Sequence, residues 1–283
     1  MLLTSPLMVT PTNFAVLTTS VTLFFTRFER LGELSDLEEA ILRYRYGADH
    51  PHGHPDKLSH LNNVGISLEA RFLRLRELGD IEEAISRHRD AVDLTPDGHP
   101  DKPACLNNLG NSLSARFDHF GELSDLEEAI SKHRDAADLT PHVHHNKPAY
   151  LNNLGNSFTR FERLGEPSNL GQAITLYSHA ASASVGTITV RFSASQKWIS
   201  CARRIRHHSL LRAYSVIISL LPELAWIGLS LTHRYRELTQ GADVVREAAA
   251  AALDFGLPEI AVEWLEQGRS IVWGELFQFR TVP

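Results

Sequence analysis

The clearest feature of the chain is an apolar pattern of helical spacing that returns at a fixed interval. In the segment LNNLGNSLSARF, Leu106, Leu109 and Leu113 fall at i, i+3 and i+7, so they share one helix face. Near-copies of this segment begin at Leu61 and Leu151, each 45 residues from Leu106. An internal period of about 20 to 50 residues is typical of a repeat array. The sequence therefore predicts stacked copies of one helical unit.

A second helix follows the first in each unit. In the segment GELSDLEEAI, Gly121 can end the first helix, and Asp125 with Glu128 fits an N-cap and its capping-box partner. In the second unit the turn glycine is placed at Gly79. The pattern predicts a helical hairpin in every unit. The equivalent capping pairs are Asp36 with Glu39, Asp80 with Glu83, and Asn169 with Gln172.

Glycine recurs inside the first helix of the units, at Gly65, Gly110 and Gly155. A glycine within a helix costs about 1 kcal/mol relative to alanine, so its recurrence needs a structural reason. The second helix carries Ala129 and His133 on one stripe. Close approach of the two helices of a hairpin at these positions supplies that reason.

These segments carry a resemblance to a known family. LNNLGNSL resembles the first helix of a tetratricopeptide repeat (TPR), and AISKHRDAADLTP is similar to the second. The usual unit has about 34 residues, whereas the longer turn and loop here extend it by roughly ten. The resemblance covers about residues 14–185 and implies four units in an all-α, right-handed superhelical solenoid of antiparallel hairpins. It is weakest at residues 21–28, and residues 1–13 are expected to be unstructured or artefactual.

Beyond Val190 the period fades but the helical pattern continues. We predict helices at about 188–205, 209–221, 233–254 and 258–279, which would complete the array over 186–279 as degenerate hairpins. The segment AVEWLEQGRSIVWGELFQFR resembles the last helix of the repeat arm in fungal proteins that join TPR arrays to a caspase-like CHAT protease domain. Residues 280–283 would then be a truncated linker. The HPD before LNNL also resembles repeats of the kinesin light chain.

Composition excludes few classes of protein, but it argues against some classes of binding partner. The net charge of −6 and the short basic run RRIRHH do not favour nucleic acid. The apolar stretch FAVLTTSVTLFF is about half of the ~20 residues that a bilayer needs. Two cysteines, Cys105 and Cys201, show neither metal nor redox spacing. We predict a cytoplasmic protein that binds neither nucleic acid nor membrane.

The candidate site is a set of asparagines that align when the units stack. An amide carries both a donor and an acceptor, which suits it to the backbone of an extended peptide in a groove. The alternative is that each asparagine bridges neighbouring units or caps local backbone. Ile66 breaks the set in the second unit. The rows are Asn62, Asn107 and Asn152, then Asn63, Asn108 and Asn153, extended by Asn111 and Asn156.

A row of lysines precedes the first helices, at Lys57, Lys102 and Lys147. If these point into the groove, they favour an acidic peptide or a C-terminal carboxylate. The alternative is that they are solvated, as lysines before a helix usually are. The carboxylate-binding pattern known from TPR proteins does not fall at these places.

No motif in the chain indicates catalysis, a metal or a cofactor. The histidine-rich loops DHPHGHPD and PHVHHN do not by themselves supply converging ligands, and loop polarity is the simpler interpretation. The sequence therefore predicts a non-enzymatic scaffold that binds a protein or linear peptide on its concave face. The alternative is the recognition arm of a CHAT-type cysteine protease whose catalytic domain is absent from the chain, with a caspase-like domain as its partner. A third hypothesis is a cargo adaptor like the kinesin light chain, but the sequence has no coiled-coil heptads that would support it.

Overall fold

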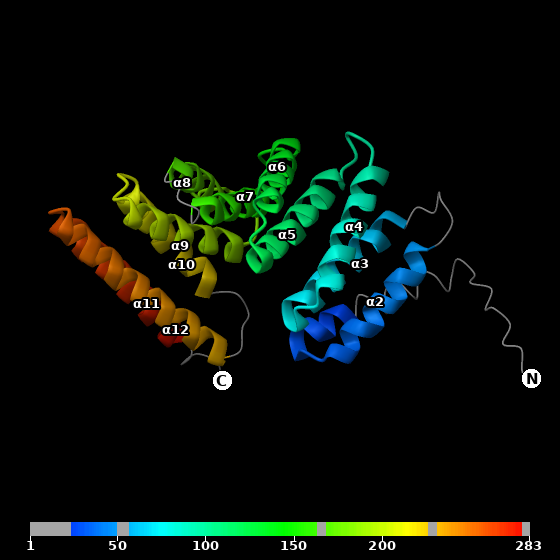
Figure 1. The fold of residues 1–283 in the computed structure, drawn as a ribbon. Coiled ribbons are helices and arrows are strands. Elements are labelled where there is room, and N and C mark those ends of the chain that lie inside the picture. The colour runs from blue at the N-terminus through cyan, green and yellow to red at the C-terminus, as the bar shows by residue number, and fades with distance from the viewer. Residues whose placement is uncertain (1–23, 50–56, 163–167, 226–230, 279–283) are drawn as a thin grey trace, which may run out of the picture. The chain divides into compact units, whose positions relative to one another are not determined.

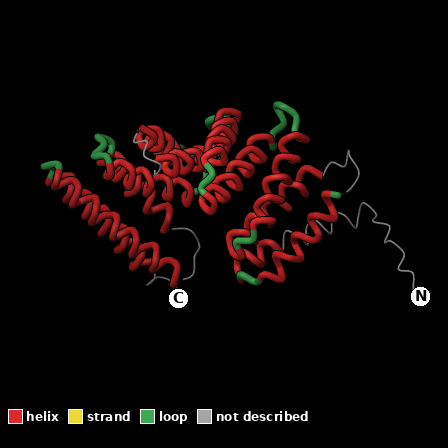
Figure 2. The backbone as a smooth tube through the Cα atoms, viewed as in Figure 1, coloured by secondary structure: helices red, strands yellow, loops and turns green. Residues whose placement is uncertain are grey.

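The computed structural model describes residues 24–49, 57–162, 168–225 and 231–278, and these residues form helices joined by loops without any strand (Figure 2). The predicted all-α fold is confirmed. A helical segment at 24–31 precedes α2, and the predicted N-terminal segment 1–13 lies outside the described residues, as do residues 280–283. The helices are α2 Leu34–Ala48, α3 Lys57–Leu75, α4 Leu78–Leu94, α5 Lys102–Phe120, α6 Leu123–Leu139, α7 Lys147–Glu162, α8 Ser168–Ala181, α9 Ile188–Arg204, α10 Leu210–Ala225, α11 Leu231–Asp254 and α12 Pro258–Gln278.

Consecutive helices pack as hairpins, and neighbouring hairpins stack. The hairpins α3–α4 and α11–α12 are plain in Figure 1. The first helices of adjacent hairpins also touch, since α3 contacts α5 and α7 contacts α9. The chain divides into two compact units, residues 1–136 and 137–283. The helices predicted between 188 and 279 are confirmed as α9 to α12.

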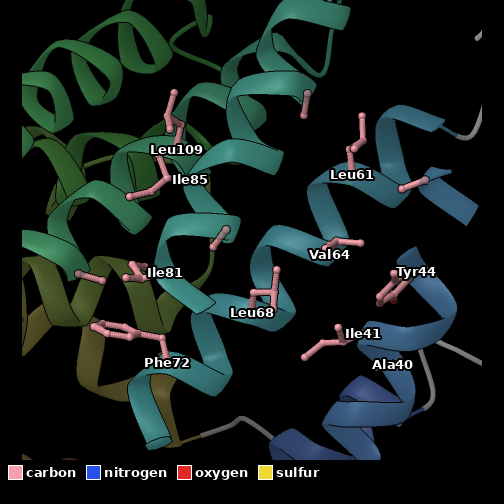
Figure 3. Packing of buried hydrophobic residues seen from close by; sticks show 14 of the residues in the cluster. Ala40, Ile41, Tyr44, Leu61, Val64, Leu68, Phe72, Ile81, Ile85 and Leu109 are labelled. Carbon is pink, nitrogen blue, oxygen red and sulfur yellow. The ribbon is translucent and has the colours of Figure 1, made fainter. Parts of the chain in front are cut away.

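The core of the first unit is made by the apolar stripes that the sequence pattern identifies. Figure 3 shows Ile41 and Tyr44 of α2 opposite Val64 and Leu68 of α3. Ile41 is 2% exposed and Leu68 is fully buried. Burying one such side chain contributes about 1.5 to 3 kcal/mol, so each pair of stripes stabilises the contact between successive hairpins.

The recurring glycines lie where the two helices of a hairpin cross. A Cβ placed on Gly110 would lie 2.6 Å from the ring of His133, and one on Gly65 would lie 2.5 Å from the ring of His88. At Gly155 the neighbour is Tyr177, at 2.7 Å. Any larger residue would therefore collide with an aromatic ring. The predicted close approach of the helices at these glycines is confirmed.

The predicted capping boxes are wrong, because the second helices begin earlier than the pattern indicated. The helix α4 begins at Leu78 with Glu77 as its N-cap, which makes no side-chain cap, so Asp80 lies in the first turn. The buried Asp80 instead accepts two hydrogen bonds from Arg71 of α3, at 2.8 and 2.6 Å. Such bidentate pairs are strong, and the helix N-terminus adds a favourable field for the carboxylate. Arg116 binds Asp125 in the same bidentate way, and Arg27 binds Asp36 through a single hydrogen bond at 2.5 Å.

The turn between the two helices uses a left-handed residue. Gly121 ends α5 with φ of 78°, as predicted. The prediction for the second hairpin is wrong, because Gly79 lies inside α4 and Arg76 takes the left-handed conformation with φ of 61°. The backbone N–H of Arg76 donates to the carbonyl of Phe72 at 2.8 Å, as that of Gly121 does to Phe117. The register of the repeat is therefore kept without glycine.

Candidate functional site

The predicted asparagine rows lie on the first helices α3, α5 and α7. Because α3 contacts α5 and α7 contacts α9, the rows run along what we call the first-helix face of each unit. Most of these amides are half-buried, and Asn107 is 7% exposed. The structure thus gathers the predicted asparagines on one face in each unit.

Several amides bridge successive first helices. In the first unit, Asn108 Nδ2 of α5 donates to Asn62 Oδ1 of α3 at 2.9 Å. In the second unit, Lys197 Nζ of α9 donates to Asn152 Oδ1 of α7 at 3.1 Å. The alternative in which asparagines bridge neighbouring units is therefore part of their role. A net contribution of about 1 kcal/mol per bond is typical for such contacts.

The amides one turn further along the first helix, those of Asn111 and Asn156, link the two helices of their own hairpin. Asn111 Oδ1 lies 3.1 Å from His133 Nε2, and Asn156 Oδ1 accepts from the hydroxyl of Tyr177 at 2.9 Å. Both aromatic residues are the ones that lie against the crossing glycines. The amide therefore satisfies a polar atom that the close helix crossing buries.

Four of these asparagines accept hydrogen bonds through the side-chain oxygen, and their side-chain nitrogens stay available as donors. Asn62, Asn111, Asn152 and Asn156 each accept through Oδ1, and within the described residues no protein acceptor lies on their Nδ2 groups. The orientation of the Asn152 amide is fixed chemically. The Lys197 ammonium can only donate hydrogen bonds, so the amide atom that faces it is the oxygen. At these four positions the first-helix faces consequently present N–H donors, whereas the Nδ2 groups of Asn107 and Asn108 already donate to neighbouring amides.

The three lysines of the row occupy the first position of α3, α5 and α7, and two of them, Lys102 and Lys147, bind carbonyls at the end of the preceding helix. Lys102 Nζ donates to the carbonyls of Val92 and Thr95 at 3.0 and 2.8 Å. Lys147 Nζ donates to those of Ala137 and Thr140 at 2.5 and 3.0 Å. An ammonium group at a helix C-terminus satisfies carbonyls that lack partners and interacts favourably with the helix dipole.

This placement changes the interpretation of the row. The interpretation of Lys147 as solvated is wrong, since the residue is 8% exposed. Lys57 is half-buried at the start of α3. A role for the three lysines in binding a ligand stays a prediction.

Two charged residues of the first-helix faces were not identified from the sequence. Glu69 of α3 accepts from Ser112 Oγ of α5 at 2.5 Å, and burial raises the pKa of its carboxyl to about 7. Lys197 lies 45 residues after Asn152, so carrying the period one unit further would have found it. Burial lowers the pKa of Lys197, and the nearby Arg160 lowers it further.

A cavity of about 600 Å³ lies beside α9 in the second unit. Arg203 of α9 donates to Glu247 of α11 at 2.8 Å across it, and also contacts the hydroxyl of Tyr214. Ile199, Ile217 and Val244 supply the apolar part of the lining. Arg203 and Glu247, two of the charged residues in the cavity lining, therefore already face each other.

Chemistry-bearing side chains outside these faces are few within the described ranges. No group of three potential metal ligands gathers there. Burial raises the pKa of the Cys105 and Cys201 thiols, that of Cys201 to about 11, so neither thiol is activated. Among the helices that the structure describes, none has the length and apolarity to cross a membrane.

Comparisons with known proteins support the fold. No protein-family model and no curated protein matches the chain. A putative kinesin light chain of Podosopora anserina with nearly identical TPR-like repeats is 15% identical, covering 77% of this chain and 96% of its own, with a TM-score of 0.50. The nuclear import adaptor Nro1 of S. pombe is 15% identical over 88% of this chain and 92% of that one, with a TM-score of 0.46.

The TPR2AB domain of yeast Sti1, solved as a complex with pHSP90, is also 15% identical and covers 90% of this chain and 99% of its own, with a TM-score of 0.36. Identities this low indicate a shared fold alone, and we base that conclusion on the first structure. The chain has a TPR-like fold, which confirms the resemblance of its repeats.

Proposed function

We propose that the protein is an interaction scaffold whose two units each hold an extended segment of a partner protein along their first-helix face. The observation that carries this proposal is the set of half-buried amide N–H groups on α3, α5 and α7 whose oxygens are already engaged. An extended peptide has a carbonyl on every residue, so it can supply acceptors to a row of donors whatever its sequence. Each such bond contributes about 0.5 to 1.5 kcal/mol net.

The engaged oxygens also favour binding at low entropic cost. Asn62 is held by Asn108, and Asn152 by Lys197, so their amides are oriented before a ligand arrives. Orienting a flexible side chain on binding costs about 0.5 to 1.5 kcal/mol, which is avoided here. The predicted alternative, the arm of a CHAT-type protease, rests on the likeness of residues 261–280 and would use the same recognition.

The proposal is tested by removing donors without moving the amide. Asn62→Asp keeps the oxygen that accepts from Asn108 and replaces the NH₂ group by a second oxygen. We expect neutral decapeptides selected by display on the wild type to bind this variant roughly tenfold more weakly, with helical circular dichroism unchanged. Gln172→Glu, the same chemical change at an exposed position of α8, is the matched control and should bind as the wild type does.

Either of two results would refute the scaffold proposal. The first is that display yields no peptide that binds the wild type. The second is that the selected peptides bind the Asn62→Asp variant as tightly as they bind the Gln172→Glu control.

A further inference from the structure

Each turn between the two helices of a hairpin in the first unit lies between two exposed apolar side chains. One is the last residue of the first helix, and the other is the first residue of the second helix. A single exposed leucine is ordinary on a protein surface, but here the same two positions are apolar in three successive hairpins. These residues, which we call the turn row, are 36% to 65% exposed: Leu31, Leu34, Leu75, Leu78, Phe120 and Leu123.

Successive turns lie side by side, so the turn row is continuous. The guanidinium carbon of Arg74, near the end of α3, lies 5.9 Å from the ring centroid of Phe28 in the preceding hairpin. One hairpin later, the ring centroid of His119, near the end of α5, lies 5.4 Å from that of Phe72. Packed helices lie about 8 to 10 Å apart, so three successive turns extend over roughly 20 Å.

The turn row lies among acidic residues. The segments that contain it, 27–39, 71–83 and 116–128, hold fourteen carboxylates and six arginines. Three of these arginines bind the three buried aspartates, and three of the glutamates pair with arginines of α2 and α4. Besides Asp118, which has an interaction of its own, seven glutamates and three arginines are left. The exposed apolar residues are therefore surrounded by an excess of negative charge.

Other parts of the array do not combine these two features. The segment 160–173, which corresponds to them in the fourth hairpin, holds two arginines and two glutamates, so the acidic excess ends with the first unit. At the opposite edge of the first unit, the first helices begin with Lys57 and Lys102, and Leu94 ends α4 without an apolar counterpart. The turns of the first unit thus differ from both regions in polarity and in charge.

The main chain at these turns is already satisfied. The backbone N–H groups of Gly32, Arg76 and Gly121 each donate to a carbonyl of the helix that they follow. An extended segment would therefore gain no main-chain hydrogen bond from them. A helix satisfies its own main chain and presents side chains alone, so it suits a surface that offers side chains alone.

We propose that the turn row binds a basic amphipathic helix of a partner protein. The apolar stripe of that helix would lie on the row, with its lysine or arginine side chains beside the surrounding glutamates. A helix of about 14 residues is roughly 20 Å long, so it reaches across the three turns. This surface is distinct from the first-helix faces, and the proposal does not depend on peptide binding there.

Three labelled 18-residue peptides test this inference by fluorescence polarisation. The first has leucines at the helical spacing i, i+3, i+4 and i+7 and lysines at the other positions. The second has glutamate in place of lysine, and the third is a scramble of the first in which the leucines are spread around the helix. We expect the first peptide to bind the wild type at least about tenfold more tightly than the other two, with an affinity that falls as salt is raised.

The apolar part of the row is tested with Leu78→Ser combined with Leu123→Ser. Both side chains are exposed, so helical circular dichroism should be unchanged, while the lysine peptide should bind at least about tenfold more weakly. The matched control is Leu94→Ser combined with Leu139→Ser. It makes the same change at the last instead of the first residue of α4 and α6, at leucines of similar exposure, and should bind as the wild type does.

The charge is tested with Glu82→Gln combined with Glu127→Gln. These exposed glutamates follow the turn row on α4 and α6, so their loss should weaken the lysine peptide several-fold and reduce its salt dependence. Asp93→Asn combined with Asp138→Asn removes two exposed carboxylates at the other end of the same helices. This control should bind the peptide as the wild type does.

Four results would overturn the inference. The wild type could bind none of the peptides, or bind the amphipathic and scrambled peptides equally. The leucine variant could bind the lysine peptide as tightly as its control does. Finally, sedimentation could show that the wild type self-associates and that the leucine variant does not, which would mean that a second copy of the chain covers the row. None of these variants alters a first-helix asparagine, so each of these results leaves the scaffold proposal to its own test with Asn62→Asp.

Discussion

The hairpins α3–α4 and α5–α6 have the same crossing but differ at one residue beside it. In each, a histidine of the second helix lies against a glycine of the first, and His88 and His133 are 0% and 2% exposed. Asn111 places its oxygen 3.1 Å from His133 Nε2, whereas Ile66 holds the corresponding position beside His88. Both ring nitrogens of His88 are buried without a hydrogen-bond partner.

The difference shows that one asparagine position serves two roles. A buried polar atom without a partner costs about 1 to 3 kcal/mol, so Asn111 stabilises its hairpin in a way that Ile66 cannot. The amide nitrogen of Asn111 remains directed away from that bond. Loss of the asparagine therefore removes a donor from the first-helix face and also removes the amide oxygen that faces the buried histidine.

The largest expected effect is a pH dependence of stability that comes from His88. Burial lowers the pKa of His88 from 6.5 to about 4. Between these values the unfolded chain binds a proton that the folded chain does not, so the stabilising contribution is full above pH 6.5 and is lost as pH falls towards 4. At 1.36 kcal/mol per pKa unit, the loss is about 3 kcal/mol.

Urea unfolding of the wild type and of His88→Phe at pH 7.5, 5 and 4 measures this contribution. The variant should lose about 3 kcal/mol less than the wild type on acidification. The raised pKa of Glu69 acts in the opposite sense, because its folded form binds the extra proton between pH 4.5 and about 7. Glu69 is present in both proteins and cancels in the difference. Equal pH dependence of the two proteins would show that His88 is already satisfied or solvated.

Sequence patterns predicted the repeat, the hairpins and the crossing glycines, because these depend on spacing along one helix or between adjacent helices. They also placed Asn62 and Asn108 on one face. They did not predict that Lys102 reaches back to the carbonyls of Val92 and Thr95, since a lysine before a helix is compatible with solvent as well. Nor did they predict that His88 lacks a hydrogen-bond partner. This depends on Ile66, which lies 22 residues earlier in the chain and on another helix.

The next largest effect is expected when the residue that distinguishes the two hairpins is exchanged between them. Asn111→Ile should lower the free energy of unfolding by about 1 to 3 kcal/mol, because it leaves His133 without the amide oxygen. Ile66→Asn should raise it by about 0.5 to 1 kcal/mol, the new bond to His88 being partly offset by the lost burial of isoleucine.

Asn63→Ile is the control for Asn111→Ile. Within the described residues the structure shows no hydrogen bond of the Asn63 side chain, so the same substitution there should change stability little. Urea titrations of the three variants decide the matter. Equal losses in Asn111→Ile and Asn63→Ile would mean that the amide beside His133 has no special role.

The smallest expected effect concerns the turn in which the two hairpins also differ. Gly121 adopts its left-handed conformation freely, while Arg76 does so at a cost of roughly 1 kcal/mol. The guanidinium carbon of Arg76 lies 5.7 Å from the centroid of the Phe72 ring, which offsets part of that cost. Arg76→Gly should therefore be more stable than Arg76→Ala by about 1 kcal/mol, since both lose the guanidinium and only glycine relieves the backbone.

Gly79→Ala distinguishes this turn from the one the sequence suggested. Nothing lies within 4 Å of a Cβ at Gly79, so alanine there should stabilise α4 by about 0.5 to 1 kcal/mol. If thermal melting instead shows that Gly79→Ala destabilises the protein while Arg76→Gly and Arg76→Ala melt together, Gly79 forms the turn and the register of α4 is shifted.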